Sequence, residues 1–249
     1  MFVKNISKSA GLAAAIASLV CAGSVYADTI TAVVGGSAQG GATYVSFDGL
    51  TPGQTTPYSS GALTVDFTGN AQTESSGVNN GSASPLLSGN NNLYFGAIYA
   101  GGDNTTYLAA GTSGNVPPGS ITFNFATAQN YFGLLWGSVD ANNTLTFYSG
   151  ANGTGSVLDT ITGTELNALN SVIAQTGYGD IYDAWGTAYV NVDIAAGFES
   201  VVATTGTFTF ELDNVAYGSN SSVPDVNMTA GLLGGALVGL QMLRRKLFC

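Results

Sequence analysis

Apolar and polar residues alternate with a period of two along five short segments, at residues 63–68, 121–125, 145–147, 190–194 and 208–212. Successive side chains of a strand point to opposite faces, so each segment predicts a β-strand with one buried face. The apolar positions are Leu63, Val65, Phe67, Ile121, Phe123, Phe125, Leu145, Phe147, Val190, Val192, Ile194, Phe208, Phe210 and Leu212. Short strands separated by Gly-rich turns are typical of antiparallel β-structure.

The alternation slips by one residue near the end of the last segment. Leu212 lies on the apolar face, but Val215 continues that face in place of Asn214. A β-bulge inserts one extra residue into a strand and produces such a slip. The sequence therefore predicts a bulge at Asp213-Asn214.

One short helix and one long loop are expected among the strands. Thr162 and Glu165 have the spacing of a capping box, and Leu166 and Leu169 then share one helical face. Residues 69–92, rich in Ser, Asn and Gly, predict a long surface loop with little core. The expected fold class is all-β: a two-sheet antiparallel β-sandwich, jelly-roll-like, with one short helix.

Positive charge is confined to the two ends of the chain. The Lys and Arg residues are Lys4, Lys8, Arg244, Arg245 and Lys246. Of the 15 Asp and Glu residues, all except Asp225 lie within residues 28–222, which contain no Lys, Arg or His. That segment therefore lacks the cations that bind nucleic-acid phosphates, the Lys of a P-loop and the imidazole of a Ser-His-Asp triad. The two cysteines of the chain, Cys21 and Cys249, lie outside this segment, so it has no disulfide.

Residues 1–27 have the order of parts of a secretory signal peptide. Two lysines precede an apolar stretch at residues 10–20, and a small-x-small site ends at Ala27, before Asp28. A retained N-terminal anchor is the alternative. The sequence predicts export, cleavage between Ala27 and Asp28, and an acidic exported domain over residues 28–222.

Residues 223–249 combine a short motif, an apolar segment and a basic cluster. The motif is Val223, Pro224 and Asp225, and the cluster is Arg244, Arg245 and Lys246. A helix over the uncharged residues 228–243 would span about 24 Å, less than the ~30 Å hydrocarbon core of a bilayer. It would be a marginal transmembrane anchor of the inner membrane, with the basic cluster on the cytoplasmic side. An ordinary tail anchor is the alternative.

This order of parts resembles the PEP-CTERM sorting signals, in the variant in which Val-Pro-Asp replaces Val-Pro-Glu-Pro. Thr229 matches the Thr or Ser that follows the motif, whereas Val226 and Asn227 depart from the usual Pro, Gly or Ser. The resemblance implies an exosortase as processing partner, a membrane-embedded cysteine protease or transpeptidase. It also implies a precursor anchored in the inner membrane of a Gram-negative-type bacterium, and then delivery to the cell surface or extracellular matrix.

The second half of the exported domain also resembles exosortase-dependent bacterial surface proteins. The likeness is carried by residues 131–140, 143–148 and 210–217, within a region of about 119–217. It implies a surface sandwich module and identifies no ligand. Trp136 lies inside an apolar strand and is expected in the core.

Calcium is the first candidate ligand. Asp213 and Asn214 lie at the expected bulge, and Asp48 ends an early strand at residues 45–48. The first and last strands of a jelly roll often lie close, so these oxygens could share one hard cation in an acidic domain. The alternative, equally open, is a bulge whose Asp and Asn bond nearby amides.

A glycan is the second candidate, in a Gly-bounded loop at residues 177–186. Its aromatic and acidic residues are Tyr178, Asp180, Tyr182, Asp183 and Trp185. Aromatic faces stack on sugar rings and carboxylates accept hydroxyl protons, so this composition suits a glycan. The alternative is a loop whose Trp185 plugs the edge of the sandwich.

Glycoside hydrolysis by two carboxylates is the one realistic catalytic chemistry for residues 28–222. Asp180 with Asp183, or Glu199 with Glu211, could form a pair, but isolated acids on solvated strand faces explain these residues more simply. We assign no catalytic residue. The sequence predicts a non-catalytic surface or matrix protein associated with exopolysaccharide, and a secreted polysaccharide-active enzyme is the alternative.

Overall fold

A computed structural model describes residues 28–33, 35–75, 78–79, 82–85, 105–111, 119–137, 139–169, 187–206 and 209–219. Within these ranges the chain forms antiparallel strands and a single short helix, which confirms the all-β class. No helix in this part of the chain is both long enough and apolar enough to cross a membrane. The predicted signal peptide, sorting tail and glycan loop lie outside the described residues.

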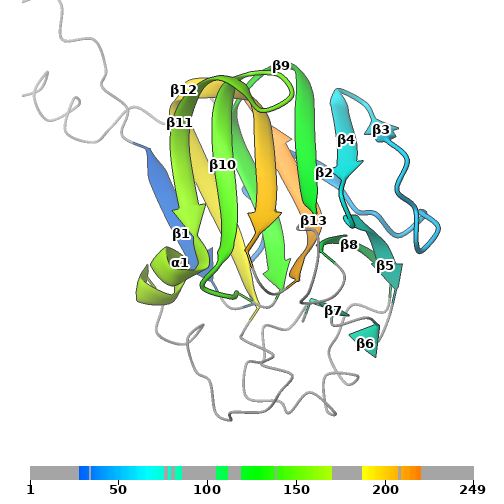
Figure 1. Cartoon of the computed structure of the whole chain (residues 1–249). Coiled ribbons are helices and arrows are strands. Elements are labelled where there is room, and N and C mark those ends of the chain that lie inside the picture. Colours follow the sequence, from blue (N-terminus) through cyan, green and yellow to red (C-terminus); the bar gives the residue numbers. More distant parts are fainter. Residues whose placement is uncertain are drawn as a thin grey trace, which may run out of the picture. The chain divides into compact units, whose positions relative to one another are not determined.

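The elements follow in chain order in Figure 1. They are β1 (Thr29–Val33), β2 (Thr43–Val45), β3 (Tyr58–Ser60), β4 (Leu63–Thr68), β5 (Gln72–Ser75), β6 (Val78–Asn79), β7 (Ser82–Ala83), β8 (Thr106–Ala110), β9 (Ser120–Gly137), β10 (Asn143–Gly150), β11 (Thr154–Thr162), α1 (Gly163–Leu169), β12 (Ala188–Thr205) and β13 (Phe210–Gly218). Four of the five alternating segments lie wholly within β4, β9, β10 and β12, and the fifth runs into β13.

Two long strands, β9 and β12, pair with each other in two stretches. The first half of β9 also pairs with β4, and its second half also pairs with β13. Between the stretches the register shifts between Asp193 and Phe198, and residues 126–128 and 195–196 are exposed. Both strands bend there, so the sheet folds over into two layers (Figure 1).

Each layer has its own strand order. The front layer runs β3-β4-β9-β12-β10-β11, and the back layer runs β1-β12-β9-β13-β8-β5, with β2 also pairing with β13. The sequence predicted two sheets. The ladders instead join the strands, apart from β6 and β7, into one 11-stranded sheet, because β9 and β12 belong to both layers.

Aromatic rings fill the space between the layers. The ring of Phe132, in the back layer, lies 5.4 Å from that of Phe123 and 6.0 Å from that of Phe147, both in the front layer. Phe198, at the bend of β12, lies 6.3 Å from Phe132. All four side chains are fully buried, and edge-to-face pairs at such distances add to the free energy of apolar burial. The two layers therefore share one core.

Three local predictions on strands and helix are confirmed. Asn214 has φ 53°, and the register of β13 against β9 shifts after Asp213, as a bulge requires. The Glu165 amide donates to Thr162 Oγ1 at 3.2 Å, which caps α1. Trp136 is fully buried and stacks on Phe210 at 4.3 Å between ring centroids.

Leu169 was predicted on the buried face of the helix, but its side chain is 55% exposed. Over the described residues Gly163–Leu169, the buried residues of the helix are Gly163 and Leu166. Leu169 therefore contributes little to the core.

The prediction of a surface loop over residues 69–92 is wrong at its start. Residues 72–75 form β5, which pairs with β8, and Thr73 is fully buried. The Thr73 hydroxyl donates to the Thr51 carbonyl at 2.6 Å, and the Thr73 carbonyl accepts a hydrogen bond from the Gly53 amide at 2.7 Å. This strand has no apolar alternation, and it forms because distant backbone groups supply its hydrogen bonds.

We expect Phe132→Ala to lower the free energy of unfolding by about 3–5 kcal/mol, because it opens a cavity where both layers meet. Urea unfolding of the mature protein measures the change. Leu169→Ala removes an exposed side chain and should change stability by less than about 0.5 kcal/mol. If Phe132→Ala lowered the free energy of unfolding no more than Leu169→Ala does, the result would contradict a core shared by both layers.

Candidate binding surface

The segments proposed to share calcium lie side by side, because β2 pairs with β13 at Val45 and Val215. Asp48 is exposed, and its Oδ2 accepts the Ser46 hydroxyl at 3.0 Å. Asp213 is fully buried, and its Oδ1 accepts the Asn214 amide at 2.7 Å. Of the two alternatives that the sequence left open, these contacts match the hydrogen-bonded bulge.

Calcium at Asp48, Asp213 and Asn214 stays a prediction. Across the described ranges, no group of three or more His, Cys, Asp or Glu side chains could hold a metal ion. Asn214 also turns its carbonyl to the Tyr189 hydroxyl, which donates at 2.9 Å. Several oxygens of the proposed set thus already accept protein hydrogen bonds, so a cation would have to share them.

The outer face of the back layer, which carries Asp213, is covered. We call it the covered face; it comprises Tyr107, Tyr131, Leu135, Tyr189, Glu211 and Asp213, and all six are buried. Two described segments lie on it: the Gln39 amide donates to the Tyr131 hydroxyl at 3.0 Å, and the Ser82 and Tyr107 hydroxyls lie 3.1 Å apart. This face is therefore a second buried layer rather than an open binding surface.

Burial of these phenols shifts their titration. Burial raises the pKa of Tyr107 well above its usual value, and the nearby Glu211 and Glu74 carboxylates raise it further against the opposing Ser82 hydrogen bond. Burial also raises the pKa of Tyr189 and of Tyr131. The folded state therefore holds these phenolic protons more tightly than the unfolded chain does.

The contribution of these phenols to stability should be constant below about pH 10, the phenol pKa of the unfolded chain, and stability should fall above that pH. Above that pH the unfolded chain releases protons that the folded state keeps, so rising pH favours unfolding. Tyr107→Phe should reduce the slope of unfolding free energy against pH by about 1.4 kcal/mol per unit. Urea unfolding from pH 9 to 12 measures it, with Tyr44→Phe, whose ring is exposed, as the control. If Tyr107→Phe and Tyr44→Phe had the same slope of unfolding free energy against pH, the result would contradict a raised pKa for Tyr107.

For calcium, we expect a chelator to lower the Tm of the mature protein, because a cation binding the folded state alone stabilises it. Asp48→Asn should remove the difference between calcium and EDTA, since Asp48 is the exposed member of the set. Glu165→Gln, which removes the charge of an exposed carboxylate outside the proposed set, is the control. If the wild-type protein had the same Tm with calcium and with EDTA, the calcium prediction would be wrong, and the hydrogen-bonded bulge alone would explain Asp213 and Asn214.

The carboxylate pair Glu199 and Glu211 is not brought together. Glu199 follows Phe198, which lies opposite Gln129 of β9, whereas Glu211 lies opposite Gly137 of the same strand. Gln129 and Gly137 are eight residues apart along β9, which is about 26 Å at a strand's rise. Glycosidase carboxylates lie within about 10 Å of each other. The pair does not have the geometry for that chemistry.

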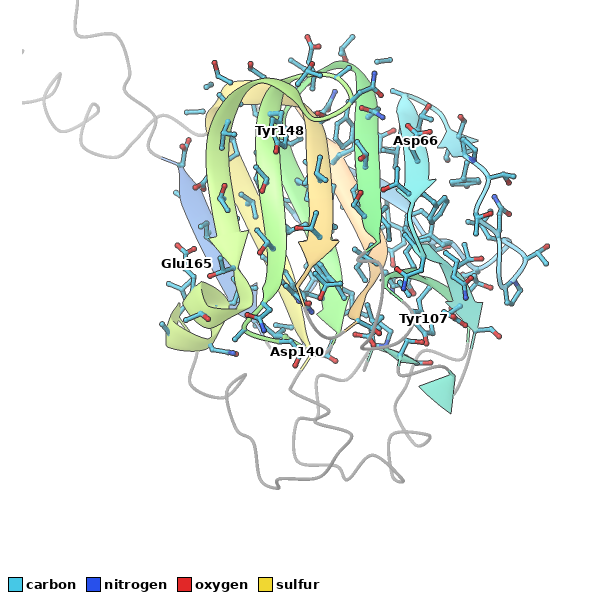
Figure 2. The ribbon with its side chains drawn as sticks, viewed as in Figure 1. Asp66, Tyr107, Asp140, Tyr148 and Glu165 are labelled. Carbon is cyan, nitrogen blue, oxygen red and sulfur yellow. The ribbon has the colours of Figure 1, made fainter. Side chains whose placement is uncertain are left out.

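The outer face of the front layer is open and rich in hydroxyl groups. We call it the hydroxyl face; it comprises Thr64, Asp66 and Thr68 of β4, Ser120, Thr122 and Asn124 of β9, Ser200, Val202 and Thr204 of β12, Thr144, Thr146 and Tyr148 of β10, and Val157, Thr160 and Thr162 of β11. All are half-buried or exposed except Ser200. Figure 2 labels Tyr148 and Asp66 on this layer and Tyr107 away from it, near β5 and β8.

Strand register aligns the hydroxyl face into three rows. One row runs Thr68-Ser120-Thr204-Thr144-Thr162, the next Asp66-Thr122-Val202-Thr146-Thr160, and the third Thr64-Asn124-Ser200-Tyr148-Val157. Each row crosses five strands. The alternation at residues 63–68 puts Thr64, Asp66 and Thr68 opposite the apolar positions of that strand, but it does not predict this surface. The repeated Thr-x-Thr pattern at residues 144–146 and 160–162 was a usable signal for it.

Comparison with known proteins identifies no family for this chain. No family model and no curated protein matches the sequence. Among solved structures, the fold is similar to the K2 cleaved adhesin domain of Lys-gingipain, with a TM-score of 0.42 and 12% sequence identity over 71% of this chain and 98% of that chain. A likeness at this level carries no argument about function.

Proposed function

We propose that this protein is an exported, non-catalytic β-sandwich protein of the cell surface or extracellular matrix that associates with exopolysaccharide. The observation that carries the proposal is the hydroxyl face, an open array of mostly uncharged polar groups on a domain without Lys, Arg or His. Hydroxyl and amide groups bind sugars by exchanging hydrogen bonds, which needs no charge on either partner.

Cleavage after Ala27, as export would require, is compatible with the contacts of Asp28 and Thr29. The Asp28 carboxylate accepts the Ala195 amide at 2.8 Å, and β1 begins at the next residue. Cleavage after Ala27 would therefore leave the first strand and its anchoring contact intact. The Thr29 hydroxyl adds a second link to β12, since it donates to Asp193 Oδ2 at 3.0 Å.

The sorting tail remains part of the proposal. We infer that an exosortase recognises Val223-Pro224-Asp225, the apolar segment and the basic cluster, all outside the described residues. The precursor would be held in the inner membrane until processing, and the mature domain would then reach the cell surface or matrix. The basic cluster directly after the apolar segment favours the cytoplasmic side, which would leave the domain before that segment on the other side of the bilayer.

A secreted polysaccharide-active enzyme is the competing function. Glu199 and Glu211 lie too far apart for it, so it would depend on Asp180 and Asp183. Glycan hydrolysis by the mature protein, lost on changing both of these residues to Asn, would favour the enzyme over the proposal.

The sorting proposal predicts that changing Arg244, Arg245 and Lys246 to Gln blocks processing in the native host, because the helix loses its basic stop. Precursor should accumulate in the inner-membrane fraction, and mature protein should disappear from the surface and matrix fractions. Intact mass should show wild-type mature protein starting at Asp28. Arg244→Lys with Arg245→Lys keeps the charge and is the control. Unchanged processing and delivery of the Gln variant would remove the exosortase claim.

A further inference from the structure

We propose that the hydroxyl face is the glycan-binding surface, and that it takes an uncharged polysaccharide chain lying across the strands. This inference rests on the proposed association with exopolysaccharide and assigns it a place in the fold. It differs from the sequence-based assignment of the glycan to the loop containing Tyr178 and Trp185.

The spacing of the rows gives the surface a regular geometry. Neighbouring strands of a sheet lie about 4.8 Å apart, and side chains on one face recur about every 6.6 Å along a strand. Thr144, for example, lies opposite Thr204 on one side and Thr162 on the other. A polymer lying along the first row therefore meets one polar side chain on each of five strands, and each of the other two rows has a valine at one of its five positions. This regular spacing matches a ligand made of repeated units.

The central hydroxyls are available to a ligand. Within the described ranges, the side chains of Thr122, Thr144, Thr146 and Thr204 make no hydrogen bond to protein, and all four are half-buried. At the margin, by contrast, Thr68 Oγ1 lies 2.6 Å from Ser120 Oγ. A hydroxyl both donates and accepts, so the central group suits the hydroxyls of a sugar, which do the same.

Charge selects an uncharged glycan over an anionic one. Asp66 is the one ionisable carboxylate of the hydroxyl face, and its Oδ2 already accepts the Asn124 amide group at 2.8 Å. The acidic domain around the face has no Lys, Arg or His to pair with a carboxylate or sulfate on a polymer. The same net charge opposes a second copy of this chain as the occupant.

One end of the face carries a positioned aromatic ring. Tyr148 is half-buried in β10, next to the tight turn that joins β10 to β11. The Asn152 amide donates to Asn124 Oδ1 at 2.6 Å, and the Gly153 amide donates to Ser200 Oγ at 3.0 Å, which fixes that turn against the sheet. Gly153 has φ 66°, a conformation that L side chains rarely adopt, and a Cβ there would also lie 3.1 Å from Val202 Cγ2. The Tyr148 ring, next to this fixed turn, offers a face on which a sugar can stack.

The test compares two triple variants of the mature protein recovered from its host. Thr122→Val, Thr144→Val and Thr146→Val remove three central hydroxyls but keep a β-branched side chain that suits a strand. The control changes Thr31, Thr43 and Thr55, exposed threonines away from the hydroxyl face, to Val. Native gels containing hydroxyethylcellulose, dextran or galactomannan, or the anionic carboxymethylcellulose, measure retardation, and the acidic domain gives all variants the same direction of migration.

We expect at least one uncharged glycan to retard the wild-type and control proteins, and the face variant to bind it at least about tenfold more weakly. Equal retardation of the face variant would overturn the hydroxyl face as the site but leave the proposed function standing. Retardation by carboxymethylcellulose alone would overturn the uncharged ligand and also leave that function standing. No retardation by any of these polymers or by the host's own exopolysaccharide would overturn both. Dimers of the wild type that the face variant does not form would assign the face to a second copy and overturn the inference.

Discussion

The pairing of β9 with β12 is the interaction on which the rest of the structure depends. Each strand takes part in both layers, so one ladder of backbone hydrogen bonds places the two layers face to face. The bend at residues 126–128 and 195–196 then lets Phe132 meet rings from the opposite layer. The core follows from this bend, because apolar side chains that alternate along a single sheet are buried only when the sheet doubles over.

The absence of cations sets how polar groups are buried in this domain. With no Lys, Arg or His in residues 28–222, buried polar groups must be satisfied by neutral donors, and the described contacts show this pattern. Thr73 is held by backbone groups of a distant turn, and the Asp213 carboxylate accepts a neighbouring amide. On the covered face, the hydroxyl groups of Tyr131 and Tyr189 supply neutral donors to Asn191 Oδ1 and to the Asn214 carbonyl.

One outer face of the folded sheet is covered and the other is open, because the side chains on the two faces differ in polarity. On the back layer the outer positions carry tyrosines and Leu135. Their apolar surface stabilises the fold only when it is buried, and the segments that contain Gln39 and Ser82 lie over it. On the front layer the outer positions carry threonines, whose hydroxyls are satisfied by water and need no cover. The open face is therefore the one that can exchange its water for a ligand.

The local features could be predicted from the order of residues: the strands β4, β9, β10 and β12, the bulge at Asn214, the cap at Thr162 and the cation-free acidic domain. Each of these follows from residues that are neighbours in the chain. Tertiary structure alone decided that β5 is a strand, that Glu199 and Glu211 lie apart, and that Thr144 lies beside Thr204. Alternation assigns a side chain to one of two faces, but the partner strand, its register and the cover on each face depend on backbone hydrogen bonds between residues far apart in sequence.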